Sequence, residues 1–563
     1  MKSAGISEKL GGVTILSRLL LAALGFLVVY PLLATIVGLV YRGDVPNLVH
    51  ATNWPAVAGM LKNTAIVVTC SSIVALFFAT VLAWIDERTD ARLPLIGQLM
   101  PLFPLLLPPV AGVMGWGILL DSNAGFLNIW LRALLTPFTG DIFRGPLNAY
   151  TMTGLVLLTG LYLVPYIYLI IAAAFRRVDP AMEEAARVAG NAPLRVMLLI
   201  TLPVIAPAIG ASVVMCFIAG IGLFSVPFII GTGARIDVLS VYVFRLLEQY
   251  PPQTALALSL AFGMMLAVQL LLLAQRFILK EGRHASIGGR GFRVNREELG
   301  AWKLPARAFV ILYVVATVVL PFLALLVVSL QPFWSPVIDP ALFTIRNYRI
   351  ALFEWGPVNL ALFNSLSLGA ITATLVTGVI GFIVLFGYYN KSFEARAADI
   401  LTAVPSTIPH TVVGVAFLIA FAFPPFNLRN SLIVLLAAYV VMALPFAGRT
   451  AAATASGISR ELAEAAKVFG AGDMRVFLKV MLPLALPGLA AGWAIIFIQT
   501  AGEVTASALL AGSQTPVIGR VLMDLWNYGS FPQVAALAII VTLINSLVIA
   551  LILKLSNRKT ANT

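Results

Sequence analysis

The sequence has little charge, almost no cysteine or histidine, and no phosphate-binding loop. Only 11% of its 563 residues are Asp, Glu, Lys or Arg, which is too few for the surface of a soluble protein. Its two cysteines, Cys70 and Cys216, both lie inside apolar runs, so they are read as small core residues rather than as a disulfide or metal pair. No G-x-x-x-x-G-K-[ST] segment is present, which excludes ATP binding through such a loop.

Apolar residues dominate instead. They make up 60% of the chain, and the mean hydropathy is +0.98. Apolar runs of about 20 residues, long enough for a membrane helix, recur throughout, whereas the alternating segments of a barrel are absent. The net charge of +13 does not indicate nucleic acid, because most Lys and Arg lie in short segments between apolar runs. We therefore predict an all-α polytopic membrane protein with no nucleic-acid partner.

About twelve transmembrane helices are predicted. They lie near residues 13–41, 59–85, 97–120, 149–175, 200–232, 254–279, 306–330, 357–388, 399–424, 430–448, 484–510 and 532–554. The main groups of basic residues in the connecting segments fall on one side of this topology. The positive-inside rule assigns that side to the cytoplasm, so both termini are expected to be cytoplasmic.

One polar stretch occurs twice, at residues 179–207 and, 280 positions later, at residues 459–487. The two copies align without a gap, and we call them the first and the second island. The repeat extends beyond them, so the chain is predicted to hold two parallel six-helix repeats. These are residues 1–280 and 306–563, joined by a basic cytoplasmic linker at 281–305. Extra residues in the first half are placed in an external segment at 121–148.

Each island is predicted to begin with a short capped helix. Asp179 is a natural N-cap with Pro180 at the first helical position, and Gly190 is a natural terminator. Ser459 and Gly470 take the same places in the second copy. Such a helix, joined closely to the next span, suits a mechanical coupling element. The alternative is an amphipathic helix lying on the inner leaflet.

These residues resemble a known motif: E-A-A, three residues, G, nine residues, then I-x-L-P. The sequence is similar to the EAA loop of bacterial ABC importer permeases of the type I, binding-protein-dependent class, and the resemblance covers nearly the whole chain. Val480 stands in the isoleucine place of the second copy. The matching residues, which the resemblance implies couple to the ATPase, are Glu184, Ala185, Ala186, Gly190, Leu202, Pro203, Glu464, Ala465, Ala466, Gly470, Leu482 and Pro483.

The resemblance implies a type I ABC importer permease fold and a set of partners. In that family the EAA segment forms a coupling helix that sits in a cleft of a cytoplasmic ATPase subunit. We expect two copies of that ATPase, a periplasmic or lipid-anchored substrate-binding protein, and a place in the bacterial inner membrane. This chain would be a transport subunit rather than an enzyme. It would bind no cofactor itself, and ATP-Mg would lie on the partner ATPase.

Both halves appear fused in one chain, as in ferric iron, thiamine and some 2-aminoethylphosphonate importers. Residues 125–128 (GFLN) and 162–186 look most like the ferric-iron group and its phosphonate and polyamine relatives. The substrate expected from the resemblance is ferric iron or a small organic solute such as 2-aminoethylphosphonate, with polyamines and thiamine left open.

The substrate pathway is expected between the halves, after the span that follows each island. Gly and Pro in these places can break a helix, and such breaks usually line a cavity. The pathway candidates are Ser225, Pro227, Glu503 and Thr505. Glu503 is an acidic residue deep in an apolar span, where a role in gating and a satisfied interhelical hydrogen bond are both open. No intramembrane cluster of metal ligands is predicted.

The main rival is a secondary transporter of the major facilitator kind, which also has twelve spans in two repeats. Its polar signature is expected between spans two and three. Residues 86–92 (DERTDAR) lack the glycines of that signature, and the repeated motif lies elsewhere. A passive channel leaves the islands unexplained, and a membrane enzyme lacks a site.

Overall fold

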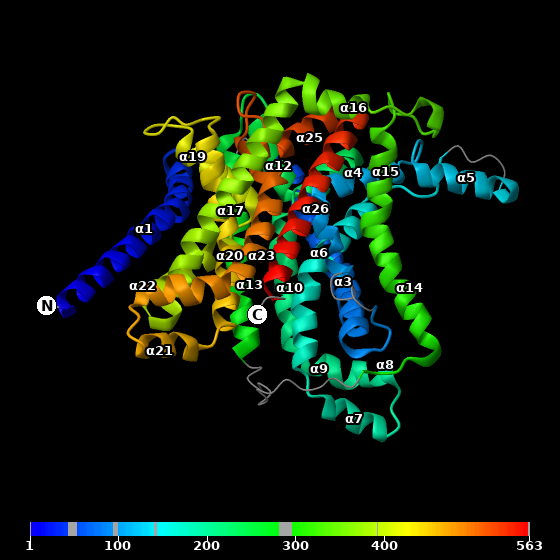
Figure 1. Cartoon of the computed structure of the whole chain (residues 1–563). Helices are drawn as coiled ribbons and strands as arrows, with labels where there is room; N and C mark the ends of the chain where they lie inside the picture. Colours follow the sequence, from blue (N-terminus) through cyan, green and yellow to red (C-terminus); the bar gives the residue numbers. More distant parts are fainter. Residues whose placement is uncertain are drawn as a thin grey trace.

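The computed structural model of the chain (Figure 1) describes residues 2–42, 53–93, 100–139, 144–280, 296–390 and 392–560. Within these ranges the regular structure is helical, apart from one isolated β-bridge between Thr89 and Glu297. The N-terminal part holds α1 (Lys2–Arg42), α3 (Trp54–Arg88), α4 (Pro109–Leu119), α5 (Phe126–Thr139), α6 (Met152–Arg177), α7 (Pro180–Val188), α8 (Pro193–Val196), α9 (Leu202–Val204), α10 (Ala206–Gly222), α11 (Thr232–Ala234), α12 (Leu239–Glu248) and α13 (Thr254–Lys280).

The C-terminal part repeats much of this order of elements, without an equivalent of α5 among its described residues. It holds α14 (Lys303–Val314), α15 (Leu320–Ser329), α16 (Arg346–Arg349), α17 (Gly356–Asn390), α18 (Phe393–Ala403), α19 (His410–Phe421), α20 (Leu432–Ser456), α21 (Arg460–Val468), α22 (Asp473–Val476), α23 (Leu482–Ala501), α24 (Thr505–Leu510), α25 (Ile518–Asn527) and α26 (Phe531–Thr560). Of the predicted linker at 281–305, residues 281–295 lie outside the described ranges.

The described residues contain nine helices long and apolar enough to cross a membrane, or up to twelve if three bent helix pairs each count as one span. Nine of the predicted spans therefore correspond to continuous helices. The spans predicted at 200–232 and 399–424 correspond to bent pairs, with bends of 74° and 101°. The span predicted at 97–120 is represented by the shorter apolar helix α4 and the 3-10 turn Met100–Leu106 before it.

Two predicted spans extend too far. α10 ends at Gly222 and α23 ends at Ala501, whereas the spans were predicted to continue to 232 and 510. In both places the chain breaks and starts a short helix instead. Residues 227–248 form a further pair bent by 83°, and α24 and α25 occupy the corresponding place in the C-terminal part.

The two parts exchange their first helices. α1 packs against α19 of the C-terminal part, and reciprocally α15 packs against α4 of the N-terminal part. The second crossing is very close, because a Cβ added at Gly115 would lie 2.6 Å from the carbonyl oxygen of Pro321. This reciprocal packing, with the α3–α6 and α17–α20 pairs inside each part, builds one continuous helical bundle with a pseudo-twofold relation between the parts.

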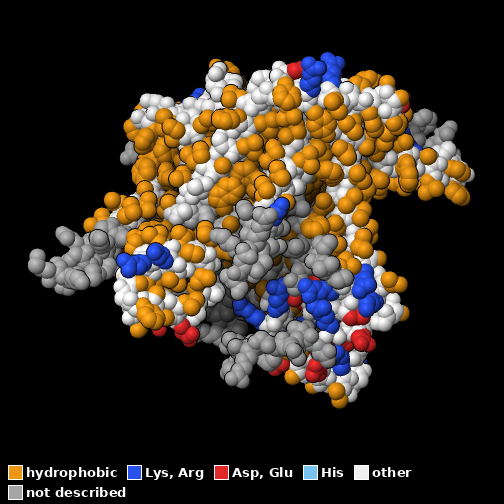
Figure 2. All heavy atoms as spheres, in the orientation of Figure 1, with side chains coloured by type: hydrophobic (Ala, Val, Ile, Leu, Met, Phe, Trp, Pro, Cys, Tyr) orange, Lys and Arg blue, Asp and Glu red, His pale blue; other side chains and the backbone are white. Residues whose placement is uncertain are grey.

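The surface of the bundle separates by polarity. Figure 2 shows hydrophobic side chains covering most of this face, with Lys, Arg, Asp and Glu gathered at the end that carries α7 and α21 and a smaller charged group at the opposite end. Many large apolar side chains are exposed on the long helices, among them Ile73, Leu266 and Leu547. Such a belt between two polar ends suits a protein that crosses a bilayer.

Candidate functional site

The first island begins with a short helix, α7, that lies at one end of the bundle (Figure 1). The Oδ1 atom of Asp179 caps it by accepting a hydrogen bond from the N–H of Ala181 at 2.9 Å. The helix ends before Gly190, whose φ of +85° is a conformation that glycine adopts readily. The N–H of Gly190 donates to the carbonyl of Arg187 at 2.8 Å. The predicted cap and terminator are confirmed.

The second island forms the same motif. The Oγ atom of Ser459 accepts a hydrogen bond from the N–H of Glu461 at 3.2 Å and caps α21. Gly470 follows the helix with φ of +81°, and its N–H donates to the carbonyl of Lys467 at 2.9 Å. α21 lies at the same end of the molecule as α7 (Figure 1).

Both helices expose the same side chains. Val188 and Val468 are 91% and 85% exposed. The residues exposed at equivalent places are Glu184, Ala185 and Val188 on α7, and Glu464, Ala465 and Val468 on α21. Ala186 is buried and Ala466 is half-buried, so these two face the bundle. The islands thus expose the same Glu, Ala and Val at three equivalent places.

The positive φ of the terminating glycines allows a local prediction. A Cβ at Gly470 meets no atom within 4 Å, so Gly470→Ala adds backbone strain alone, which we expect to cost about 1 kcal/mol. The nearby Gly472 has φ of −72° and equally open surroundings, so Gly472→Ala is the matched control and should be neutral. Thermal unfolding of both variants in detergent measures this difference. Equal melting temperatures would contradict the helix-terminating role of Gly470.

Each short helix is followed closely by a membrane helix. In the first island, α8 continues through a π-helical turn (Met197–Thr201) into α9, which begins at Leu202–Pro203, and then bends into α10. In the second island, α22 continues through a π-helical turn (Phe477–Met481) into α23, which begins at Leu482–Pro483. The motif prolines therefore lie inside the continuous helical segments Pro193–Val204 and Asp473–Ala501, directly after the π-helical turn of each.

A buried ion pair fixes α7 to the end of α3. Arg88 is 3% exposed, and its Nη1 lies 3.1 Å from Oε2 of Glu183. The other oxygen of Glu183 accepts a hydrogen bond from Oγ1 of Thr201 at 2.7 Å. Arg88 also donates through Nη2 to the carbonyls of Phe175 and Val178. One guanidinium thus joins α3, the end of α6 and α7.

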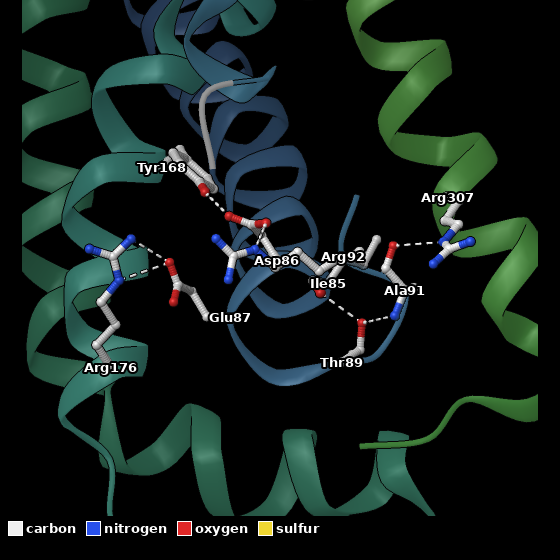
Figure 3. Close-up of polar contacts among 9 residues, drawn as sticks. All are labelled: Ile85, Asp86, Glu87, Thr89, Ala91, Arg92, Tyr168, Arg176 and Arg307. Atoms are coloured by element: carbon white, nitrogen blue, oxygen red, sulfur yellow. Dashed lines mark hydrogen bonds and ion pairs between the residues drawn. The ribbon is translucent and has the colours of Figure 1, made fainter. Parts of the chain in front are cut away.

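More charged side chains surround this end of α3 (Figure 3). The hydroxyl of Tyr168 donates to Oδ2 of Asp86 at 2.6 Å, and Nε of Arg92 lies 3.5 Å from Oδ1 of the same carboxylate. Nε of Arg176 on α6 donates to Oε1 of Glu87 at 2.9 Å. Residues 86–92 (DERTDAR) therefore connect α3 with α6 and α7 through charged and polar contacts, and we call them the polar joint.

The residues after 281–295 bind to this joint as well. The N–H of Asp90 donates to the carbonyl of Glu297 at 2.9 Å, and Oε2 of Glu297 lies 3.1 Å from Nη1 of Arg187 on α7. Lys303 Nζ lies 2.7 Å from Oδ2 of Asp90, and this hydrogen bond lowers the pKa of the Asp90 carboxyl. Burial raises the pKa of Glu297, although Arg187 opposes this. The start of the C-terminal part is thus attached to the first island.

The second island is supported by apolar contacts instead. Ala463 and Met481, both buried, take the places of Glu183 and Thr201, and the ring of Phe477 packs against those of Phe382 and Phe386. A cavity of about 280 Å³ lies behind α21, lined among others by Leu385, Ala463, Glu464, Lys467 and Met481. The two islands therefore match on their exposed faces and differ underneath.

The predicted helix breaks lie where the two parts meet. A Cβ at Gly222, the end of α10, would lie 3.0 Å from Cβ of Pro409, just before α19. The equivalent Gly502 lies against Pro108, just before α4, at 3.5 Å. Each break thus touches a helix start in the other part. Ser225, Pro227 and Thr505 follow these breaks and are buried, whereas Glu503 is half-buried.

The carboxylate of Glu503 is fully engaged at the start of α24. Oε1 accepts a hydrogen bond from the N–H of Ala506 at 2.9 Å, and Oε2 accepts one from the N–H of Ser507 at 3.0 Å. The hydroxyl of Ser507 lies 3.0 Å from the same Oε2 and 2.7 Å from the hydroxyl of Tyr439. An acidic group at a helix N-terminus is stabilised by these donors and by the helix dipole. These bonds are local, to residues three and four positions along the chain, rather than interhelical, and a role of Glu503 in gating stays a prediction.

The short helices after the breaks are held symmetrically. On α3, Asn63 donates to the carbonyl of Asp237, and Thr64 accepts from the N–H of Leu239 at the start of α12. On α17, Asn364 donates to the carbonyl of Pro516 and Ser365 accepts from the N–H of Ile518 at the start of α25. At the end opposite α7 and α21, an ion pair joins α25 to α12, with Arg520 Nη1 2.9 Å from Oε1 of Glu248.

Sequence reasoning missed the residues beneath the first island, namely Arg88, Glu183, Thr201 and Glu297. The detectable signal was the contrast between Glu183 and its counterpart Ala463, in copies that otherwise agree. Among the described residues, no group of three or more His, Cys, Asp or Glu could hold a metal ion.

Comparison with known proteins finds one family of membrane transport proteins in both parts of the chain. The family model described as "Binding-protein-dependent transport system inner membrane component" matches twice, at residues 91–280 and 378–561. A putative ferric transport system permease protein of Haemophilus influenzae is 24% identical over 87% of this chain and 77% of its own length. A probable ABC transporter permease protein of Sinorhizobium fredii is 28% identical over 90% and 87%. A spermidine/putrescine transport system permease protein of Haemophilus influenzae matches 38% of this chain with 82% of its own length, at 28% identity.

Proposed function

The chain belongs to the family of binding-protein-dependent transport system inner membrane components, and from this membership we propose that it is a permease with both halves of the pathway fused in one polypeptide. Residues 1–280 and 306–563 are the two halves, and residues 281–305 join them. The twofold match of the family model and the reciprocal packing of α1 on α19 and of α15 on α4 support this division.

Coupling to ATP hydrolysis is assigned to the two islands. The observation that carries this assignment is the matched exposed face of α7 and α21, with Glu184, Ala185 and Val188 repeated as Glu464, Ala465 and Val468 at one end of the bundle. Each helix would occupy a cleft of one ATPase copy, so that two copies bind one permease. ATP-Mg is bound and hydrolysed on those subunits. The charged end in Figure 2 is then cytoplasmic, and so are both termini.

The structure suggests how movement reaches the pathway. Because α7 is joined to α3 through Arg88 and to the π-helical turn through Thr201, displacement of α7 would move both membrane helices together. ATP binding would draw the two islands toward each other and open the opposite end, where α12 and α25 now meet through Glu248 and Arg520. ATP thus shifts an equilibrium between two arrangements of the halves. The candidates Ser225, Pro227, Glu503 and Thr505 flank this pathway, with Glu503 in a positioning role.

The substrate proposed is ferric iron or a small organic solute such as 2-aminoethylphosphonate. Support comes from the ferric transport relative, while the spermidine/putrescine relative keeps polyamines as a further candidate. A periplasmic or lipid-anchored binding protein would select this substrate and deliver it. The secondary-transporter alternative is not favoured, because both halves match the ABC permease family.

The test is the ATPase activity of the chain with its ATPase subunit in lipid nanodiscs. Binding protein is added empty or loaded with each candidate ligand. We expect one loaded form to stimulate ATP hydrolysis several-fold, which would identify the substrate. If the permease neither retained an ATPase nor responded to any loaded binding protein, the importer assignment would be wrong.

A further inference from the structure

The segment between α4 and α6 carries an exposed apolar helix that has no counterpart among the described residues of the C-terminal part. α5 (Phe126–Thr139) projects sideways from the bundle, at the end opposite α7 and α21 (Figure 1). Trp130 and Phe138 are 82% and 83% exposed. The exposed positions of this helix are Trp130, Ala133, Leu134, Pro137 and Phe138. They recur with the three- and four-residue spacing of one helix face, and all are apolar.

The root of α5 is rigidly held, so this face points in a fixed direction. Asn128 is completely buried. Its Nδ2 donates to the carbonyls of Asp121 and Leu147, at 2.8 and 2.6 Å, and its Oδ1 accepts from the N–H of Leu147 at 3.0 Å. A side chain at Gly145 would overlap Asn128, since a Cβ there would lie 2.2 Å away. The amide of Asn128 thus holds together the segment that leaves the bundle after α4 and the segment that returns to it before α6.

α5 lies at the height of the bundle where the surface of a membrane is expected. The helix begins shortly after α4 ends at Leu119 and the chain re-enters the bundle at α6. Its first residue, Phe126, packs on Trp334 with ring centroids 5.3 Å apart, and Phe531 contacts both Trp334 and Trp526. Clustered tryptophan and other aromatic rings at helix ends are characteristic of the boundary between hydrocarbon and water.

We propose that α5 is an interfacial helix that lies on the outer leaflet, with Trp130, Leu134 and Phe138 inserted among the lipids. Three features favour lipid over a protein partner. The face is convex, since it is one side of a single projecting helix. It contains no charged side chain, and its hydrogen-bonding group is the indole N–H of Trp130, a side chain typical of the membrane boundary. It also continues the hydrophobic surface of the bundle (Figure 2). Such a helix would fix the tilt of the N-terminal half against the membrane.

Fluorescence quenching by lipid tests this placement. In a Cys70→Ser, Cys216→Ala background, an environment-sensitive fluorophore is attached at Leu134→Cys, and separately at Phe138→Cys on the same face. Thr136→Cys, on the opposite face of α5, is the matched control, and Leu266→Cys on α13 reports a membrane-embedded site. The chain is reconstituted with its ATPase into phosphatidylcholine vesicles that contain a lipid with a spin label near the headgroup.

We expect quenching of the probes at 134 and 138 to be at least about twofold stronger than quenching of the probe at 136. The reason is that a helix is about 10 Å across, so the probe at 136 lies farther from the spin label. Addition of binding protein should leave this pattern unchanged. Equal quenching on both faces, or protection that arises only when binding protein is added, would overturn the proposal. A probe at 266 that escapes a quencher placed deep in the acyl chains would instead refute the membrane placement itself, on which the proposed function also rests.

Discussion

A chain carrying both Glu184→Arg and Glu464→Arg is expected to lose its ATPase subunits and all ATP-driven uptake while the membrane bundle stays folded. Both carboxylates are exposed on α7 and α21, so neither substitution disturbs the core. The new guanidinium reverses the charge and adds bulk beside the exposed Ala and Val that the two helices share. Buried interfaces tolerate an unpaired charge poorly, and we therefore expect retention of the ATPase to fall by at least about a hundredfold.

The measurement is co-purification of a tagged ATPase with the permease, followed by uptake into proteoliposomes. Each single variant keeps one intact island and should retain one ATPase copy. Glu298→Arg, an exposed acidic position at the same end of the molecule, is the matched control and should bind ATPase normally. Normal uptake by the double variant would show that the islands do not couple to ATP hydrolysis.

The second large effect is expected at Arg88. Arg88→Ala leaves the carboxylate of Glu183 buried without its cation, and breaking one side of a buried ion pair costs about 3–5 kcal/mol. The same change frees α7 from the ends of α3 and α6, so ATP hydrolysis should continue while transport is lost. Thermal unfolding and the ratio of uptake to ATP hydrolysis report these two effects separately.

Two further variants make this prediction specific. Adding Glu183→Ala to Arg88→Ala removes the orphaned carboxylate and copies Ala463 of the second island, so most of the lost stability should return. Arg92→Ala removes a nearby arginine that is partly exposed and lies 3.5 Å from Asp86. Because Asp86 keeps its hydrogen bond from Tyr168, this variant should lose less stability than Arg88→Ala. A double variant as unstable as Arg88→Ala alone would mean that Arg88 stabilises the fold without Glu183.

Much of the fold follows from local sequence. Apolar runs of membrane length locate nearly all the spans, and Asp179, Ser459, Gly190 and Gly470 mark the ends of α7 and α21 because caps and terminators act within a single turn. The ungapped repeat likewise indicates two equivalent islands. These features depend on neighbours a few residues apart, which is the range over which a sequence pattern is informative.

The remaining features depend on distant residues. Gly and Pro indicate that the helices can break near 222 and 502, but the point at which α10 and α23 end depends on contact of Gly222 with Pro409 and of Gly502 with Pro108 in the other part. The ion pair of Arg88 with Glu183 joins residues on separate helices, and such a pair produces no periodic pattern in the sequence from which it could be predicted. The same holds for α5, whose exposed face is apparent only once the bundle beside it is known.

The most direct test of the central claim is site-specific photo-crosslinking of the permease to its ATPase in lipid nanodiscs. A photoreactive amino acid is placed at Val188, at Val468, or at both, and at Tyr250 as an exposed control near α12. If α7 and α21 each occupy one ATPase, each single site should capture one ATPase copy and the double site two, with none captured from position 250. Capture from neither island, or no more than one copy from the doubly substituted chain, would contradict the assignment of two equivalent coupling helices.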